Sequence, residues 1–367
     1  MLCAALALPG LAVGAEMDVV AGQGLVAVRM LSYRDRQPGL ERVRADSPSL
    51  QLQLPLGGRW SVDATATRDS VSGASPRWHS SISGASRLRE NRSAFDARFS
   101  HHGERDTWSV GLATSDEHDY ESRAVSVEWR HSSEDNNRSV ALSAGHARDR
   151  IRSSDDPTLD ARRRSTSLGA SFTLALTALD VAQASLSWTD GRGWFSDPYK
   201  ALDQRPDRRR QTALLLRWNH HVAALDASLR SQWRIYRDSF GVRAHTLGLE
   251  WAQALSPTWT LTPIVRVHTQ GAASFYADPV YDRIGEPYPP GFFDQPPRFL
   301  SLDHRLSAFG ALTLGLKLEA ALAPKWIADL RVDRYKQRGS WRVGGSGSPG
   351  LAPLKANFVQ FGVVHRF

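Results

Sequence analysis

The residues of this sequence that could do chemistry are charged side chains that alternate with apolar ones. Asp63 is flanked by a valine and an alanine, and Arg266 by two valines. Charged groups at every second position share one face of an extended strand, and that face needs water or ion partners. Mixed signs at this spacing fit a path that selects solutes, and they also fit a solvated wall held together by ion pairs. The candidates are Asp63, Asp96, Arg98, Glu128, Arg130, Arg217, Asp226, Arg230, Arg234, Arg266, His268, Lys317, Asp329 and Arg331.

No motif of a catalytic class accompanies these charges. The chain has no Gly-x-Ser-x-Gly, His-Glu-x-x-His, P-loop or EF-hand pattern, and no Cys-x-x-Cys-His for a c-type haem. The pairs His101-His102 and His220-His221 fall in predicted short turns. Neighbouring strand residues point to opposite faces, so each pair is a poor two-ligand metal site. We therefore expect no enzyme, no cofactor and no metal site.

The C-terminal segment 357–367, NFVQFGVVHRF, shows which kind of element positions the charges. From Phe367 back to Val359, every second residue is aromatic or apolar except His365, which predicts a strand. A strand of this length that ends on Phe367 is typical of the closing strand of a bacterial outer-membrane β-barrel. In that class the terminal aromatic residue is a signal to the barrel-assembly machinery. The alternative is an ordinary last strand of a soluble sandwich.

The rest of the chain repeats this alternation. It predicts about sixteen strands, and no helix-period segment of useful length competes with them. Short connections alternate with a second set of connections. This second set is long, apart from two exceptions near Asp116 and Ser239. The long connections are 35–46, 71–90, 149–162, 191–209, 271–301 and 338–353. This arrangement predicts an all-β fold: a single transmembrane antiparallel up-and-down barrel with long outer loops, short periplasmic turns and both termini periplasmic. The charged face would line its lumen.

Tryptophan placement follows the length of the connections. Seven tryptophans fall at predicted strand ends beside the short turns. In a soluble protein these would be core residues, with no reason to follow turn length. In a membrane barrel they form an aromatic girdle at one interface, where an amphipathic ring is most stable. The girdle residues are Trp60, Trp108, Trp129, Trp218, Trp251, Trp259 and Trp326.

Composition sets the class and compartment. Mean hydropathy is −0.38, and no apolar run after the N-terminus is long enough for a transmembrane helix. Residues 1–15 are apolar and uncharged and end in a small-residue cleavage site, which predicts a signal peptide followed by a barrel domain at 16–367. The missing basic n-region suggests a start upstream of Met1. The single cysteine, Cys3, lies in this peptide, so the mature chain would have no disulfide.

The chain is basic, with a net charge of +8 and a pI of about 9.9. Only five of its 46 basic residues are lysines, so arginine supplies nearly all of the positive charge. In an exported barrel we expect outer-membrane lipid, lipopolysaccharide phosphates or anions in a pore as partners, rather than nucleic acid.

The connection 271–301 is unusually long and aromatic. Its bulky rings would expose an apolar patch if the loop were floppy, and its prolines keep it from pairing as strands. We predict that it folds over or into the lumen and gates access. The alternative is a loop packed on neighbouring loops or on a partner protein. The gate residues would be Phe275, Tyr276, Tyr281, Tyr288, Phe292 and Phe293.

Several stretches resemble one known family. They are VSGASPRWHSSISGAS at 71–86, SDPYK at 196–200, RPDRRR at 205–210, YRDSFGVRAHT at 236–246, RLSAFGA at 305–311, KQRGSW at 336–341 and GGSGSPGL at 344–351. The sequence is similar to domain-of-unknown-function family 3570, which comprises uncharacterised bacterial outer-membrane proteins. The resemblance implies an outer-membrane barrel without an assigned activity. It also suggests an association with a small lipoprotein and flavin-linked redox chemistry.

Two functional hypotheses remain open. The first is a channel or transporter barrel that passes a small solute. The second is a structural sheath or conduit around a small periplasmic or lipoprotein redox partner in envelope electron transfer. An open lumen in the purified protein would favour the first, and co-purification of a lipoprotein or flavin would favour the second.

Overall fold

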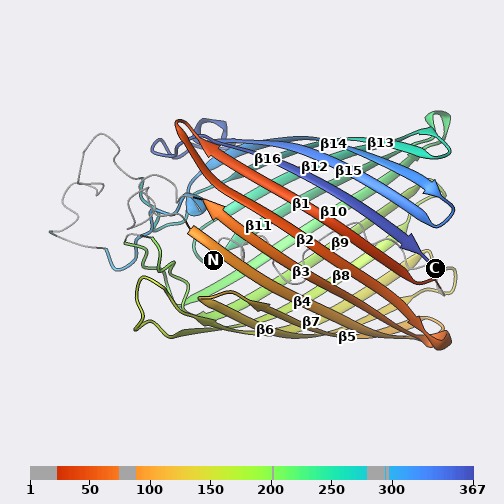
Figure 1. Cartoon of the computed structure of the whole chain (residues 1–367), viewed down its shortest axis with the longest axis horizontal. Coiled ribbons are helices and arrows are strands. Elements are labelled where there is room, and N and C mark those ends of the chain that lie inside the picture. The colour runs from red at the N-terminus through yellow and green to blue at the C-terminus, as the bar shows by residue number, and fades with distance from the viewer. Residues whose placement is uncertain (1–22, 74–87, 201, 279–293, 295–296) are drawn as a thin grey trace.

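The computed structural model describes residues 23–73, 88–200, 202–278, 294 and 297–367, and these residues form one closed barrel of antiparallel strands (Figure 1). No helix among them is long and apolar enough to span a membrane. The strands are β1 (Leu25–Gln37), β2 (Leu40–Leu56), β3 (Trp60–Gly73), β4 (Leu88–His102), β5 (Asp106–Asp116), β6 (Tyr120–Ser132), β7 (Arg138–Ile151), β8 (Ala161–Ala175), β9 (Asp180–Gly193), β10 (Arg208–Val222), β11 (Ala227–Asp238), β12 (Arg243–Ser256), β13 (Trp259–Gln270), β14 (Phe309–Ala323), β15 (Trp326–Arg338) and β16 (Leu354–Arg366).

Each strand pairs with its neighbours in sequence, and β1 pairs with β16 to close the barrel. Closure satisfies the backbone groups that an open sheet edge would leave unpaired. Beyond the two strands, Gly24 and Phe367 exchange a pair of backbone hydrogen bonds of 2.9 and 3.0 Å. The predicted all-β barrel and its count of about sixteen strands are therefore confirmed.

The two faces of the wall differ in chemistry as the alternation predicts. On β14, Leu312, Leu314 and Leu316 face outward, whereas Lys317 and Glu319 face inward. Large apolar side chains are exposed on the outer face of nearly every strand. An apolar outer belt of this extent requires lipid rather than water around it.

The connections divide between the two ends of the barrel. The connections 57–59, 103–105, 133–137, 176–179, 223–226, 257–258 and 324–325 lie at one end, the turn end, where the C-terminus also lies (Figure 1). The opposite end, the loop end, carries the longer connections 152–160, 194–207, 271–308 and 339–353 and the short connections 117–119 and 239–242. Residues 74–87 of the connection between β3 and β4 lie outside the described residues.

One predicted long loop is wrong. Segment 35–46 is a tight hairpin in which β1 runs to Gln37 and β2 starts at Leu40, with Gly39 at φ 70° in the turn. Polar residues suggested a loop here, but Asp35 accepts a hydrogen bond from the backbone of Val43 at 3.1 Å and pairs with Arg42 at 3.7 Å. Asp35 thus has partners within the hairpin, and backbone pairing continues to Gln37 and Leu40, past the expected boundary.

Membrane orientation can be tested with single cysteines in a variant that lacks Cys3. We expect Thr158→Cys, exposed at the loop end, to react with an impermeant maleimide on intact cells. Glu134→Cys, exposed in a turn-end connection, should react only after the outer membrane is permeabilised. Labelling of Glu134→Cys alone on intact cells would reverse the predicted orientation.

Candidate functional site

The inner wall carries nearly all of the charged candidates. Register places every one of them on the inward face except Asp226, which follows the short 3-10 helix Ala223–Leu225 in a left-handed conformation with φ 45°. Asp226 therefore belongs to a turn-end connection and not to the wall. A charged residue followed by alternating apolar residues resembles a strand start, so sequence alone could not separate it from β11.

Part of this wall is neutralised by ion pairs. Lys317 bonds Glu319 at 2.7 Å, and Arg331 bonds Asp333 at 2.9 Å, in each case along one strand. On β3 and β4, Asp63 lies in register with Arg98, whose neighbour two residues away is Asp96. Partly exposed pairs such as these add little stability, but they hold long side chains in fixed positions along the lumen.

One sector of the wall, across β10 to β13, is strongly basic. Three successive inward rows place Arg230 with Glu250 in the first row, Arg217 and Arg266 in the second, and Arg234 in the third. We call these four arginines the basic sector. Arg234 stacks over the ring of Tyr236 at 5.0 Å, and no salt bridge involves Arg234 or Arg266 among the described residues.

His268 lies beside the basic sector and is held by neutral partners. Its ring forms hydrogen bonds of 2.8 Å with Thr246 and 3.3 Å with Gln270. Within the described part of the chain, no group of three or more His, Cys, Asp or Glu side chains is arranged to hold a metal ion.

The predicted girdle tryptophans lie on the outer face at the turn end. Two of them are anchored to aspartates that start the neighbouring strand: Trp129 donates to Asp106 at 2.9 Å, and Trp218 to Asp180 at 3.0 Å. Sequence reasoning missed their histidine partners. His131 and His220 each lie two residues after one of these tryptophans, stack on it and bond the same aspartate. The repeated Trp-x-His spacing is the signal that marks this arrangement.

The histidine pairs of the sequence lie on strands, which corrects the predicted placement in turns. His101 and His102 end β4, and His220 and His221 lie near the end of β10. In each pair one ring faces outward and the other faces inward. His101 packs on Trp60 with ring centroids 4.5 Å apart, while His102 bonds Ser61 at 2.8 Å.

At the loop end, residues 194–200 and 202–207 of one connection and 271–278 and 297–308 of another fold onto the inner wall of β8 to β13. Phe240, from the connection between β11 and β12, is nearly fully buried and packs on Phe195 and Phe275. Inward-facing Tyr236 joins this cluster. Gln270, inward on β13, donates to the backbone oxygens of Arg305 and Ser307 at 3.0 and 2.8 Å. We call these described residues of the two connections the loop pair.

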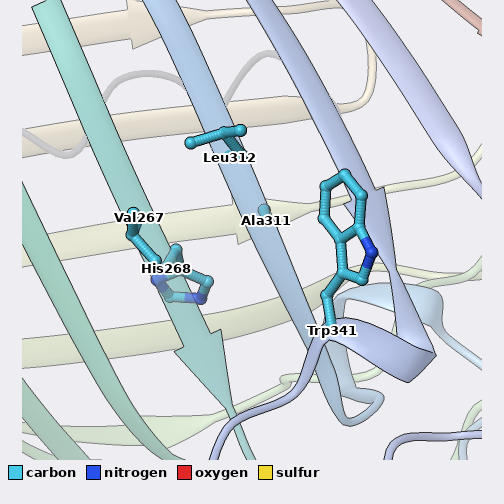
Figure 2. Close-up of a pocket in the computed structure, with 5 residues that line it drawn as sticks. All are labelled: Val267, His268, Ala311, Leu312 and Trp341. Carbon is cyan, nitrogen blue, oxygen red and sulfur yellow. The ribbon is translucent and has the colours of Figure 1, made fainter.

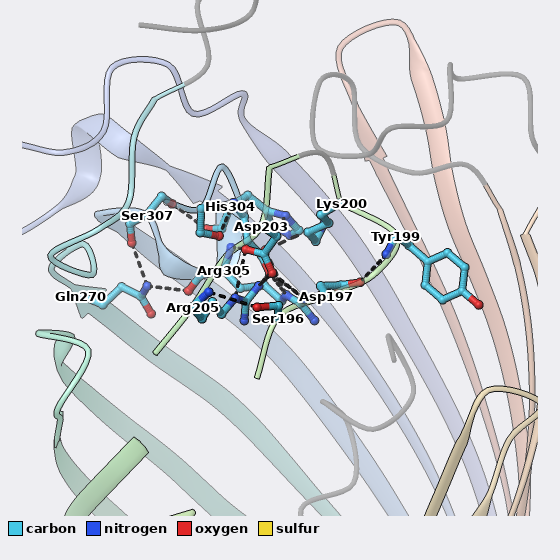
Figure 3. Close-up of polar contacts among 12 residues, drawn as sticks. Ser196, Asp197, Tyr199, Lys200, Asp203, Arg205, Gln270, His304, Arg305 and Ser307 are labelled. Atoms are coloured by element: carbon cyan, nitrogen blue, oxygen red, sulfur yellow. Dashed lines mark hydrogen bonds and ion pairs between the residues drawn. The ribbon is translucent and has the colours of Figure 1, made fainter. Parts of the chain in front are cut away.

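A buried group of charges joins the loop pair (Figure 3). Asp303 has a fully buried side chain that accepts hydrogen bonds from Arg205 at 2.7 Å and from Arg305 at 2.8 Å. Arg305 also bonds Asp197 at 2.8 Å, and Arg205 bonds Asp203 at 2.8 Å. With Lys200, whose ammonium lies 4.0 Å from Asp303, the group holds three cations and three carboxylates. We call these six residues the ionic cluster.

Electrostatics within the ionic cluster favour ionised carboxylates at its centre. Burial alone would raise the pKa of Asp303, but Arg305, Lys200 and Arg205 together hold it well below its ordinary value. The pKa of Asp197 is lowered in the same way, mainly by Arg305 and Lys200 acting against burial. Burial raises the pKa of Asp203 and lowers that of Lys200.

Sequence reasoning missed the ionic cluster, although most of its members lie in the stretches that carry the family resemblance. SDPYK contains Asp197 and Lys200, RPDRRR begins with Arg205, and RLSAFGA begins with Arg305. Of the predicted gate residues, Phe275 and Tyr276 belong to the loop pair and pack in its aromatic cluster with Phe240. Tyr281, Tyr288, Phe292 and Phe293 lie outside the described residues, so the gate itself stays a prediction.

Two hollows lie near the loop end. One, of about 290 Å³, is bordered by Val267 and Leu312 on the outer face and by Trp341 from the short helix Gly339–Trp341 (Figure 2). Its apolar border and outward position suit lipid contact rather than solute passage. The other, of about 500 Å³, borders the ionic cluster at Asp197, Lys200 and Asp203.

Solved outer-membrane barrels share this fold. CdiB from Acinetobacter baumannii matches with a TM-score of 0.51 and 10% identity over 92% of this chain and 60% of CdiB. A bacterial polysaccharide outer membrane secretin matches with a TM-score of 0.50 and 10% identity over 93% of this chain and 98% of the secretin. The siderophore receptor PirA from Pseudomonas aeruginosa matches with a TM-score of 0.48 and 13% identity over 91% of this chain and 61% of the receptor. This chain thus spans about three fifths of CdiB and PirA, and the likeness concerns the fold alone.

No curated protein sequence matches the chain. A family model described as "Protein of unknown function (DUF3570)" matches residues 1–87, 82–172 and 158–358. The matched ranges include both segments of the loop pair and every strand, the last of them in part. The resemblance drawn from the loop stretches is thereby confirmed, and the chain belongs to the family of proteins of unknown function DUF3570.

Proposed function

We propose that this protein is an outer-membrane channel for small anionic solutes, with the turn end and both termini in the periplasm. The apolar outer belt and the tryptophan girdle support membrane insertion. A polar inner wall of sixteen strands supports a water-filled passage, because a barrel of that size is wider than its own side chains can fill. The loop pair would narrow its entrance.

The observation that carries the proposal is the basic sector. Arg234 and Arg266 lie close enough to repel each other, and no carboxylate pairs with either among the residues that the structure describes. Unneutralised like charges on a lumen wall raise the local concentration of anions. Asp63 and Asp96 lie on β3 and β4, half the barrel circumference away. An anion would therefore pass along the side of the lumen formed by β10 to β13.

Reversal potentials in planar bilayers under a KCl gradient test this function. We expect the purified protein to conduct and to prefer chloride, and Arg234→Gln/Arg266→Gln to lower the anion-to-cation permeability ratio by about threefold or more. The matched control is Arg334→Gln/Arg338→Gln, which removes the same charge from the outer face of β15 and should leave the ratio unchanged.

A wild-type barrel that folds but does not conduct would contradict the channel. In that case, co-purification of a small lipoprotein or a flavin with the barrel would favour the sheath around a redox partner instead. If both double variants conduct with the same anion-to-cation permeability ratio, the protein is a channel but the basic sector does not set its selectivity.

A further inference from the structure

Five arginines lie in register across five consecutive strands on the outer face, near the loop end. Backbone pairing joins Arg123 to Arg148, Arg148 to Arg164, Arg164 to Arg192, and Arg192 to Arg208. All five side chains are exposed. We call them the arginine row. They come from separate strands and are not neighbours in the sequence.

The arginine row is electrostatically costly without an anion. Side chains directly opposite each other on adjacent strands lie about 5 Å apart at Cβ, and like charges at such positions destabilise a sheet. Asp190 relieves one end, bonding Arg192 at 3.3 Å and Arg208 at 2.8 Å. Among the described residues no carboxylate pairs with Arg123, Arg148 or Arg164. Three adjacent guanidinium groups therefore share one uncompensated patch.

The patch lies where the apolar belt ends. Outward side chains on β6 change from Val125 to Arg123, and on β8 from Leu168 through Thr166 to Arg164. On β9 the last outward ring before Arg192 is Trp188, two outward positions below it. Arginines at this level extend into the headgroup layer while their stems cover apolar surface. This position distinguishes them from basic residues on loop tips, which face bulk water.

We propose that the arginine row binds the phosphate groups of a phosphorylated glycolipid of the outer leaflet, of the lipid A type. Guanidinium groups pair with phosphate oxygens in bidentate geometry, so adjacent arginines can share one phosphate. A lipid with two phosphates can neutralise several members of the row at once. The proposal adds a lipid site to the proposed channel and rests only on its orientation, with the loop end in the outer leaflet.

Native mass spectrometry of the detergent-purified barrel, titrated with diphosphorylated lipid A, tests the proposal. We expect Arg148→Gln/Arg164→Gln to weaken binding by about tenfold or more, because each substitution removes a charge-assisted contact. The control Arg68→Gln/Arg334→Gln removes two outward arginines whose register partners are not basic, and it should bind within about twofold of wild type.

Heat-modifiable gel mobility establishes that each variant is folded. Lipid A stripped of both phosphates should bind wild-type protein as weakly as the row variant binds the intact lipid. Equal affinities of the two double variants for diphosphorylated lipid A would overturn the proposal. Equal affinity of the wild-type protein for lipid A with and without its phosphates would also overturn it. A negative result in any of these lipid-binding experiments does not bear on the channel proposal, which the conductance measurement tests separately.

Discussion

Asp303→Asn should detach the loop pair and raise single-channel conductance severalfold. The substitution removes the carboxylate that joins Arg205 to Arg305 inside a fully buried site. Removing one partner of a buried ion pair costs about 3–5 kcal/mol, because the remaining charges are left uncompensated. That cost exceeds the stabilisation that the remaining contacts of the loop pair can supply. Segments 194–207 and 271–308 should therefore separate while the wall of sixteen strands stays intact.

The matched control is Asp160→Asn. Asp160 also bonds an arginine at the loop end, Arg150, at 2.8 Å, but the two side chains are 47% and 45% exposed. Exposed pairs contribute about 0–1 kcal/mol, so conductance should not change. If Asp303→Asn folds, as judged by heat-modifiable mobility, and conducts like wild type, the ionic cluster does not narrow the entrance.

The pH dependence of conductance gives a second readout with a definite sign. The pKa of Asp303 in the folded protein is below its ordinary value, so its stabilisation is complete above about pH 4 and is lost as the pH falls through the folded value. Asp203, whose pKa burial raises, takes up its proton first; because the folded protein holds this proton more tightly than the unfolded chain does, its uptake does not destabilise the fold. Conductance should therefore stay constant from neutral pH to about pH 4 and rise only below it.

The fold could be predicted because its signal is local and repeated. Period-two alternation in each strand, turn length and tryptophan position all pointed to the same barrel, and the register confirms it. The boundary errors have one cause. Around Asp35 and Asp226, polar residues at strand ends carry no alternation that separates wall from turn, and only tertiary contacts decide where the strand stops.

The candidate sites were predicted unevenly for the same reason. Inward charges such as Arg234 belong to a strand pattern and could be assigned to a face. The ionic cluster joins Asp197 to Arg305, which are 108 residues apart, and neither lies in a periodic segment. The arginine row depends on register across strands, which alternation within a strand does not determine. Each of its members reads in isolation as an ordinary solvated arginine.

Deleting Phe367 should reduce the amount of folded barrel in the outer membrane more than tenfold, because two losses coincide. Phe367 and Gly24 exchange the last backbone hydrogen bonds of the seam between β1 and β16, and deletion leaves the Gly24 groups unpaired. The ring of Phe367 lies on the outer face beside His365, with centroids 6.0 Å apart, where the assembly machinery is predicted to recognise it.

Phe367→Ala and Phe367→Tyr separate the two losses, because both keep the backbone bonds of the seam. If the ring is an assembly signal, Phe367→Ala should reduce the amount of folded barrel in the outer membrane nearly as much as the deletion does. Phe367→Tyr should keep that amount near the wild-type level. Refolding of purified chains into detergent, without the machinery, should then rescue Phe367→Ala but not the deletion. The measurement in both settings is the heat-modifiable gel shift. Normal membrane levels of folded Phe367→Ala would show that the ring is not an assembly signal. Efficient refolding of the deletion variant would show that the remaining backbone ladder of β1 and β16 closes the seam without its last pair.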